Sequence, residues 1–196
     1  LNPSSAASDV YKRQEENQLS IRGIVQAWDV ETGSPITTFT ISGDDIEIET
    51  EKLAGVLSFI VPPDYEITSE YTATVTAVPP DGRVVATQNI IVAIIDINDN
   101  SPVITSGTTF SVAENETSIG TVTATDGDAS DTVTFTVSDS ELSITSEGVL
   151  TFAVAPDYET KTSYTATVRA SDGKNSTYQN ITINVTNLND NSPVFT

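Results

Sequence analysis

Carboxylates in short, regularly spaced motifs are the residues of this sequence best suited to chemistry. Asp64 and Glu66 stand two positions apart, and so do Asp126 and Asp128. In an extended chain, residues i and i+2 project to the same side, so each pair can chelate one ion while Tyr65 turns toward a core. Each motif alone has an alternative interpretation, a solvated loop or a turn in which the aspartate binds its own backbone.

The segment from Asp96 to Pro102 (DINDNSP) carries further oxygen ligands and contains no flexible Gly/Ser spacer. Alternation would direct Asp96, Asn98 and Asn100 to one side of the chain. Asp99 would face the other side, so that one short segment serves the parts of the chain before and after it. Crowded carboxylates repel one another unless cations lie among them. Ligation by oxygen alone favours Ca²⁺, and Mg²⁺ is less suitable because it requires a smaller octahedral shell.

The composition excludes several other kinds of chemistry. The 196 residues hold 28 Asp plus Glu against 8 Lys plus Arg, a net charge of −20, which repels nucleic acid and anionic membranes and favours cations. The chain has no Cys and no His, so disulfides, thiolate or imidazole ligands and Ser-His catalysis are ruled out. No apolar run approaches the roughly 18 residues that span a bilayer, so we expect no direct membrane insertion by this fragment.

The sequence repeats one module. GVLSF at residues 55–59 recurs as GVLTF at 148–152, and PDYE at 63–66 recurs at 156–159, both with an offset of 93. NDNSPV at 98–103 recurs at 189–194 with an offset of 91. A module of about 90 to 100 residues is long enough to build its own core. The chain therefore reads as two tandem domains.

Apolar residues alternate with polar ones inside each module, as at Tyr164, Ala166 and Val168. A period of two with many β-branched residues predicts strands that bury one face. About seven such strands, separated by Gly, Asp and Ser, and no segment of helical period, predict an all-β fold. We expect two tandem seven-stranded Greek-key immunoglobulin-like β-sandwiches, at residues 15–100 and 101–196. Residues 1–14 look like translated adapter sequence, and we expect a disordered, non-native leader that leaves the N-terminal strand of the first repeat truncated or replaced.

Taken together, the motifs resemble the extracellular cadherin repeat over residues 15–196. They are Glu-Asn near the start, Asp-x-Asp, Pro-Asp-Tyr-Glu, Ala-Ser-Asp-Gly and Asp-x-Asn-Asp-Asn-x-Pro. The resemblance implies a cadherin-like fold and three Ca²⁺ ions at the junction of the repeats. The residues that it implies as ligands of the two ions nearer the first repeat are Glu16, Asp64, Glu66, Asp96, the Ile97 carbonyl, Asp99 and Asp128. Those implied for the third ion are Asn98, Asn100, Asp126, Asp128 and Asp172.

The resemblance also implies a half-site at each end, completed by neighbouring repeats of a longer array. The C-terminal half-site comprises Glu114, Asp157, Glu159, Asn187, Asn189, Asp190 and Asn191. It is weaker by one charge, because Asn187 stands where the first linker has Asp96. The N-terminal half-site comprises Asp29, Glu31 and Asp81, with Glu31 in place of the family's Asp. Pro63 and Pro156 replace the family's Leu but leave the ligands in place.

The expected function is that of a calcium-dependent cell-adhesion or spacer module of an extracellular, cell-surface protein whose parent is membrane-associated. Ca²⁺ would make the linker rigid, and the partners would be Ca²⁺, neighbouring repeats and another cell-surface protein or glycan. The alternatives are direct homophilic or glycan binding and a calcium-independent immunoglobulin-like spacer. We expect no enzyme, because every acid pair that could act in glycoside hydrolysis is better explained by metal ligation.

Further features bear on the origin and mechanism of the protein. A Cys-free, Thr-rich, acidic composition resembles large bacterial surface adhesins more than animal junction proteins. The single Trp, Trp28, is expected to be structural and gives no support to adhesion by exchange of an N-terminal strand. Sequons begin at Asn115, Asn175, Asn180 and Asn184, and they are glycan sites only in a eukaryotic secretory host.

Overall fold

The chain folds into two compact units, one ending at Ile97 and the next beginning at Asn98. The computed structural model describes residues 10–28, 34–51, 54–81, 86–128 and 131–192. All of the regular structure within these ranges is β-strand, which confirms the predicted all-β fold. Within the same ranges no helix has the length and apolarity to cross a membrane. The boundary between the units lies slightly before the one expected from the sequence.

The first unit contains two main sheets. Its strands are β1 (Val10–Glu15), β2 (Ser20–Val25), β3 (Ala27–Trp28), β4 (Pro35–Ile36), β5 (Phe39–Ile41), β6 (Ile46–Glu51), β7 (Ala54–Phe59), β8 (Glu70–Ala77) and β9 (Ala86–Ile95). One sheet has the order β1-β9-β8-β5, and the other has the order β2-β7-β6, with a short β3-β4 pair beside them. The pairing of β1 with β9 is parallel, and the remaining pairs are antiparallel.

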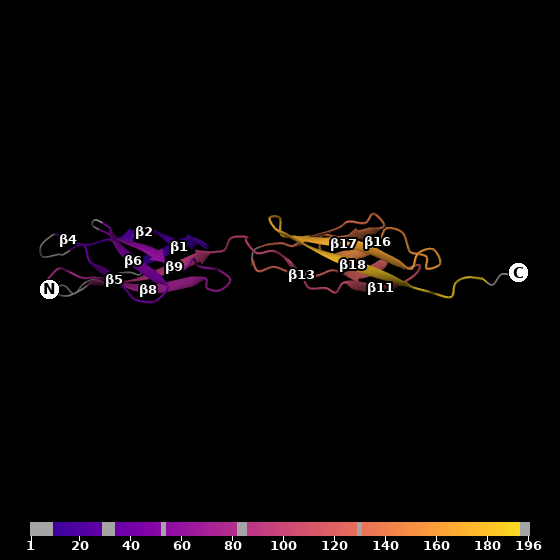
Figure 1. The fold of residues 1–196 in the computed structure, drawn as a ribbon, viewed down its shortest axis with the longest axis horizontal. Helices are drawn as coiled ribbons and strands as arrows, with labels where there is room; N and C mark the ends of the chain where they lie inside the picture. Colours follow the sequence, from indigo (N-terminus) through magenta and orange to yellow (C-terminus); the bar gives the residue numbers. More distant parts are fainter. Residues whose placement is uncertain (1–9, 29–33, 52–53, 82–85, 129–130, 193–196) are drawn as a thin grey trace. The chain divides into compact units, whose positions relative to one another are not determined.

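The second unit repeats the two main sheets of the first (Figure 1). Its strands are β10 (Val103–Ile104), β11 (Thr109–Ala113), β12 (Ser118–Thr121), β13 (Ala124–Thr125), β14 (Thr134–Val137), β15 (Leu142–Ile144), β16 (Val149–Phe152), β17 (Ser163–Ser171) and β18 (Ser176–Thr186). The sheets are β11-β18-β17-β14 and β12-β16-β15, with a β10-β13 pair. Counting segments separated by a short break as one strand gives seven strands among the described residues of each unit, in a Greek-key sandwich.

The predicted alternation is realised in the core. On β17, Tyr164, Ala166 and Val168 are buried. Tyr164 lies opposite Ile183 of the neighbouring strand β18, and Ala166 lies opposite Ile181. Each such buried aliphatic side chain contributes about 1.5–3 kcal/mol to folding. Each core also contains its own edge-to-face aromatic pair. The ring centroids of Phe59 and Tyr71 lie 4.9 Å apart in the first unit, and those of Phe152 and Tyr164 lie 4.7 Å apart in the second.

The expectation that residues 10–14 lie outside the fold was wrong. They form most of β1, which pairs in parallel with β9 from Val10 opposite Ile90 to Glu15 opposite Ile95. The pairing uses backbone groups, which every sequence offers to a free sheet edge, so an unrelated side-chain pattern did not prevent it. Residues 1–9 lie outside the described residues. Trp28, expected to be structural, is 58% exposed on β3.

Candidate metal centre

Glu16 follows directly after β1 and ties three segments of the first unit together. Its carboxylate accepts the backbone N–H of Tyr65 at Oε2 (2.7 Å) and of Ile97 at Oε1 (2.9 Å). Its own N–H donates to the Ile95 carbonyl at 3.3 Å. The side chain is only 1% exposed. The parallel pairing of β1 with β9 therefore brings this glutamate between the PDYE motif and the start of the linker.

Glu114 holds the same place in the second unit. Its Oε2 accepts the N–H of Tyr158 at 2.8 Å, and its Oε1 accepts the N–H of Leu188 at 2.7 Å. It is likewise 1% exposed. Tyr158 corresponds to Tyr65 in the repeat. The two units thus build the same carboxylate-centred arrangement around a shared Glu-Asn pair, although the residues before the glutamate differ.

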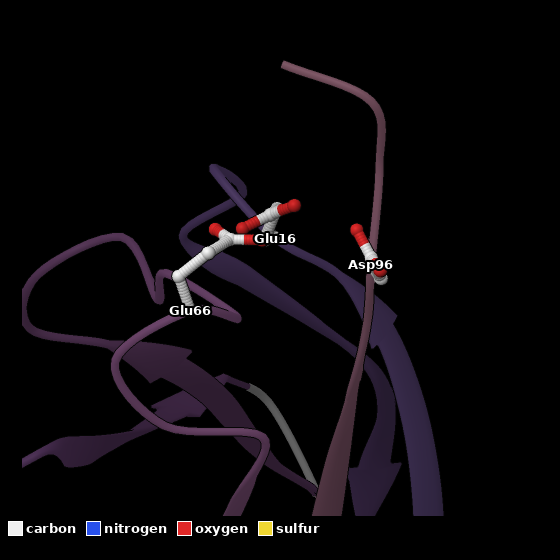
Figure 2. A group of neighbouring side chains, drawn as sticks. All are labelled: Glu16, Glu66 and Asp96. Atoms are coloured by element: carbon white, nitrogen blue, oxygen red, sulfur yellow. The ribbon is translucent and has the colours of Figure 1, made fainter. Parts of the chain in front are cut away.

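One carboxylate oxygen from each of Glu16, Glu66 and Asp96 lies within 4.8 Å of the other two. Figure 2 shows Glu66 reaching toward Glu16, with Asp96 facing them from the segment that follows β9. Oxygens on opposite sides of a calcium ion lie roughly 5 Å apart, because each Ca–O distance is about 2.3–2.6 Å. The spacing of these three oxygens therefore suits one calcium ion.

The PDYE motif is a turn, and the extended geometry expected from its sequence was wrong. The N–H groups of Ile67 and Thr68 donate to the Asp64 carbonyl, at 3.3 and 2.9 Å. Asp64 Oδ1 accepts the Ile67 N–H at 3.1 Å, so it caps its own turn and does not join the three-carboxylate group. Tyr65 packs against the core, as expected.

The second unit gathers Asp126, Asp128 and Asp172, each with a carboxylate oxygen within 4.8 Å of the others. Asp126 follows β13 and Asp172 follows β17. Asp128 is 2% exposed. Asp126 Oδ2 and Asp172 Oδ2 are buried, and no hydrogen-bond donor reaches them in the part of the chain that the structure describes. Buried carboxylate oxygens without a donor are costly, and a cation would remove that cost.

Asn98, Asp99 and Asn100 begin the second unit and contact this cluster. Asp128 Oδ2 accepts the Asn100 N–H at 3.0 Å, and Asp128 Oδ1 accepts Asn100 Nδ2 at 2.9 Å. Asn100 Nδ2 also donates to Asp99 Oδ1 at 3.2 Å. The expected alternation of Asp99 against Asn100 is therefore wrong, because bends at residues 98 and 100 interrupt the extended chain.

The pKa of Asp172 lies below its ordinary value. Burial acts to raise it, but the backbone N–H groups of Asn175 and Lys174, which donate to the carboxylate, outweigh burial. Both N–H groups reach Asp172 Oδ1 at 2.6 Å. Asp172 is therefore charged near neutral pH and available to a cation.

The C-terminal half-site is assembled in part. Oxygens of Glu114, Glu159 and Asp190 lie within 4.8 Å of one another. Asn187 Nδ2 donates to Glu159 Oε1 at 3.0 Å. Asp157 does not join this group, because its Oδ2 accepts the Thr160 hydroxyl at 2.8 Å and its Oδ1 accepts the Glu159 N–H at 3.0 Å. The Thr160 hydroxyl is the main cause of a lowered pKa at Asp157. Asn189 and Asn191 are exposed.

The N-terminal half-site cannot be built from the described residues. Asp29 and Glu31 lie outside them, and Asp81 is exposed in the turn after β8. The set Asp29, Glu31 and Asp81 therefore remains a prediction.

Three residues near the acidic cluster of the second unit were not predicted from the sequence. Asn175 Nδ2 donates to Asn98 Oδ1 and to the Asn100 carbonyl, and Lys174 Nζ donates to the Asn98 carbonyl. Asp131 donates its N–H to the Asp128 carbonyl at 3.2 Å, and its Oδ2 is buried with no donor among the described residues. The position of Lys174 and Asn175 directly after the Asp172-Gly173 pair was the only sequence signal.

Comparisons with known proteins connect this geometry to a family. Protocadherin-11 X-linked of Pongo pygmaeus is 34% identical over 189 residues, which cover 87% of this chain and 14% of that protein. Protocadherin Fat 1 of Homo sapiens is 30% identical over 207 residues, covering 96% of this chain and 4% of that protein. Protocadherin-15 of Gallus gallus is 36% identical over 187 residues, which cover 88% of this chain and 10% of that protein. The chain thus spans a small part of the relatives that it matches. No protein-family profile matches it.

Solved structures share the fold. Extracellular cadherin domains 1–4 of Protocadherin Gamma B7 match with a TM-score of 0.79 and 21% identity, over 93% of this chain and 50% of that one. Mouse Cadherin-23 EC22-24 matches with a TM-score of 0.72 and 21% identity, over 93% of this chain and 65% of that one. The relatives named are vertebrate proteins, so the expected kinship with bacterial adhesins is not supported. The sequence similarity to protocadherins and the shared sandwich topology together show that this chain belongs to the cadherin repeat family.

Proposed function

We propose that this chain binds calcium and that bound calcium stiffens the segment joining its two units, as part of an extracellular adhesion or spacer protein. The observation that carries the proposal is the cluster of Asp126, Asp128 and Asp172, where two buried carboxylate oxygens have no donor among the described residues. Charge buried without a partner destabilises a fold, so a cation from solvent would complement the cluster.

The chemistry of the donors supports calcium over other metals. Every candidate ligand is a carboxylate, amide or carbonyl oxygen, and the sequence has neither Cys nor His. Such ligands suit hard cations, and clusters assembled from turns and strand ends are flexible enough for the six to eight ligands that Ca²⁺ takes. Mg²⁺ would require a tighter octahedral shell.

The continuity of the chain supports the proposal that both units supply ligands to the same ions. Asp96 and Ile97 end the first unit, and Asn98, Asp99 and Asn100 begin the second. Five consecutive residues thus carry oxygens from both. We propose three junction ions with the ligands that the family resemblance implies. Their charge of +6 would offset most of the −8 carried by eight carboxylates: Glu16, Asp64, Glu66, Asp96, Asp99, Asp126, Asp128 and Asp172.

The same proposal extends to the incomplete sets. Glu114, Glu159 and Asp190 would bind calcium weakly until a following repeat adds ligands, with Asp157, Asn187, Asn189 and Asn191 completing the set. Asp29, Glu31 and Asp81 would serve a preceding repeat. Such an array would act as an extracellular spacer or adhesive stalk at the cell surface, with a structural and binding role and no catalysis.

Calcium titration and scattering test the proposal together. Calorimetry should resolve about three tighter ions, with dissociation constants of about 10⁻⁵ to 10⁻³ M, typical of weaker sensor and extracellular sites. Small-angle scattering should show a larger, narrower distribution of maximum dimension in calcium than in chelator, while circular dichroism stays strand-like. Absence of heat in millimolar calcium would exclude the metal assignment. Calcium binding with superimposable scattering profiles would exclude the stiffening function alone.

Direct homophilic binding is a second candidate, favoured by one observation. Exposed Ile60, Val61 and Ile67 line a groove on the first unit together with Tyr71, Pro62 and three aspartates, Asp44, Asp45 and Asp64. Exposed apolar surface of this kind often marks a protein contact, and the occupant in this case would be a second copy of the chain. Val61→Asp should then lower self-association in analytical ultracentrifugation, whereas Val103→Asp, exposed outside the groove, should not. Monomeric wild-type chain at high concentration would exclude this candidate.

A further inference from the structure

The turn between β17 and β18 holds two side chains next to the acidic cluster of the second unit. Gly173 takes φ of +99°, a conformation that favours glycine. Asp172 Oδ1 accepts the backbone N–H groups of both Lys174 and Asn175. These bonds fix the turn, so the side chains of Lys174 and Asn175 are held where the cluster begins.

Those two side chains bind the oxygens of the linker. Asn175 Nδ2 donates to Asn98 Oδ1 at 3.0 Å and to the Asn100 carbonyl at 2.8 Å. Lys174 Nζ donates to the Asn98 carbonyl. Asn98 and Asn100 are the residues proposed above to ligate the third calcium ion. An amide and an ammonium group therefore bind oxygens of both residues that are proposed to hold the metal ion.

Cations are scarce enough in this unit for the position of Lys174 to be informative. Residues 98–196 contain three cationic side chains, Lys161, Arg169 and Lys174. Lys161 pairs with Glu141, and Arg169 donates to two serine hydroxyls at 3.0 and 2.6 Å. Lys174 is the one that the fold directs to the linker beside the acidic cluster. Its charge offsets part of the repulsion among those carboxylates.

We infer that Lys174 and Asn175 form an internal substitute for the third calcium ion, and that they set its affinity by competing for the linker oxygens. The inference rests on the proposed calcium function. In the metal-free chain the pair holds Asn98 and Asn100 in place. Calcium binding requires the amide and the ammonium to leave those oxygens, so the bonds that order the metal-free linker weaken calcium binding.

Two substitutions separate this role from a simple charge effect. Asn175→Ala removes the amide donors without changing charge, and Lys174→Gln removes the ammonium. Each variant should bind calcium about fivefold more tightly at one junction site, the change expected from losing one net hydrogen bond. In chelator, each should also speed hydrogen exchange of the backbone N–H of Asn100. Matched controls are Asn184→Ala, an exposed asparagine of β18, and Lys161→Gln, which removes a charge elsewhere in the unit.

The outcomes distinguish competition by Lys174 and Asn175 from the calcium binding on which it rests. Tighter calcium binding in both variants, with faster exchange in chelator and unchanged controls, would support the inference. Wild-type affinity in Asn175→Ala, or weaker binding in either variant, would overturn it while leaving calcium binding intact. If Lys161→Gln raised the calcium affinity by the same factor, the Lys174 effect would be one of overall charge, and the proposed competition would be overturned. A wild-type chain that binds no calcium would overturn the proposed function and this inference with it.

Discussion

The Glu114 carboxylate accepts the backbone N–H of Tyr158 at 2.8 Å across 44 residues of chain, while its second oxygen binds the N–H of Leu188. Glu114→Ala leaves the part-buried N–H groups of Tyr158 and Leu188 without this acceptor. We expect the second unit to lose about 1–3 kcal/mol of stability, the cost of leaving one buried group unsatisfied. Urea unfolding in chelator, followed by circular dichroism, measures the loss. Glu116→Ala, at an exposed neighbour, is the control, and equal stability of the two variants would contradict the structural role.

Replacement of Gln14 is expected to raise the stability of the first unit, whereas replacement of Glu114 lowers that of the second. It is 5% exposed, and its Oε1 has no hydrogen-bond donor among the described residues. Val112 holds the corresponding position of β11. Gln14→Val should therefore stabilise the first unit by about 1 kcal/mol, because it removes an unsatisfied buried oxygen. Trp28 fluorescence during urea unfolding reports this unit alone. Gln26→Val, at an exposed site, should have no comparable effect, and a destabilised Gln14→Val would show that the amide is needed.

Gly148 is required by the backbone. It has φ of +89°, and a Cβ built there would lie 2.1 Å from the Val122 carbonyl oxygen. Gly148→Ala should cost about 3–5 kcal/mol, because a backbone clash adds to the strain of a positive φ. A Cβ on Gly107 would meet nothing within 4 Å, so Gly107→Ala should change stability by less than about 0.5 kcal/mol. Thermal unfolding of the two variants compares them, and similar melting temperatures would contradict the local geometry.

Asp99 and Asp190 occupy the same motif but have different neighbours along the chain. Only Asp99 is followed by a second unit in these 196 residues. Asp99→Ala should weaken calcium binding by at least about tenfold, because it would remove a charged ligand from the proposed junction site, and Asp190→Ala should weaken the tighter sites far less. Calorimetric titration in matched buffer measures both. Equal losses would mean that the C-terminal set is already complete or that neither residue is a ligand.

Glu147 supplies a pH-dependent test away from the proposed metal ligands. The Ser146 hydroxyl donates to Glu147 Oε1 at 2.8 Å and is the main cause that lowers the pKa of Glu147. A lowered pKa in the folded state adds stability that is present above the ordinary glutamate pKa of about 4.3 and is lost as pH falls through the folded value. Ser146→Ala should raise the Glu147 pKa toward its ordinary value in an NMR titration. Ser143→Ala should leave it unchanged, and an unmoved pKa in Ser146→Ala would assign the shift to another cause.

Much of the fold and of the candidate ligand set could be predicted from local sequence. The period of two at Tyr164, Ala166 and Val168 fixes which face is buried, because side-chain direction in a strand depends only on parity. The 93-residue offset of the GVLSF and GVLTF motifs defined the repeat. Asp126 and Asp128 were predicted as partners, since the motif that contains them is short. Glu16 entered only through the family resemblance, because nothing near it in the sequence marks it as a ligand.

The tertiary structure decided what depends on segments far apart in the chain. Glu16 is buried because parallel pairing of β1 with β9 brings it to Tyr65 and Ile97, and that pairing uses backbone groups that leave no side-chain signature. Asp64 accepts the Ile67 N–H inside the PDYE turn, whereas strand geometry alone predicted a chelating pair with Glu66. Sequence therefore determined which residues could bind a cation, through residue type and local spacing. Only the fold decided which oxygens converge, because long-range backbone pairing and turn geometry fix where each carboxylate lies.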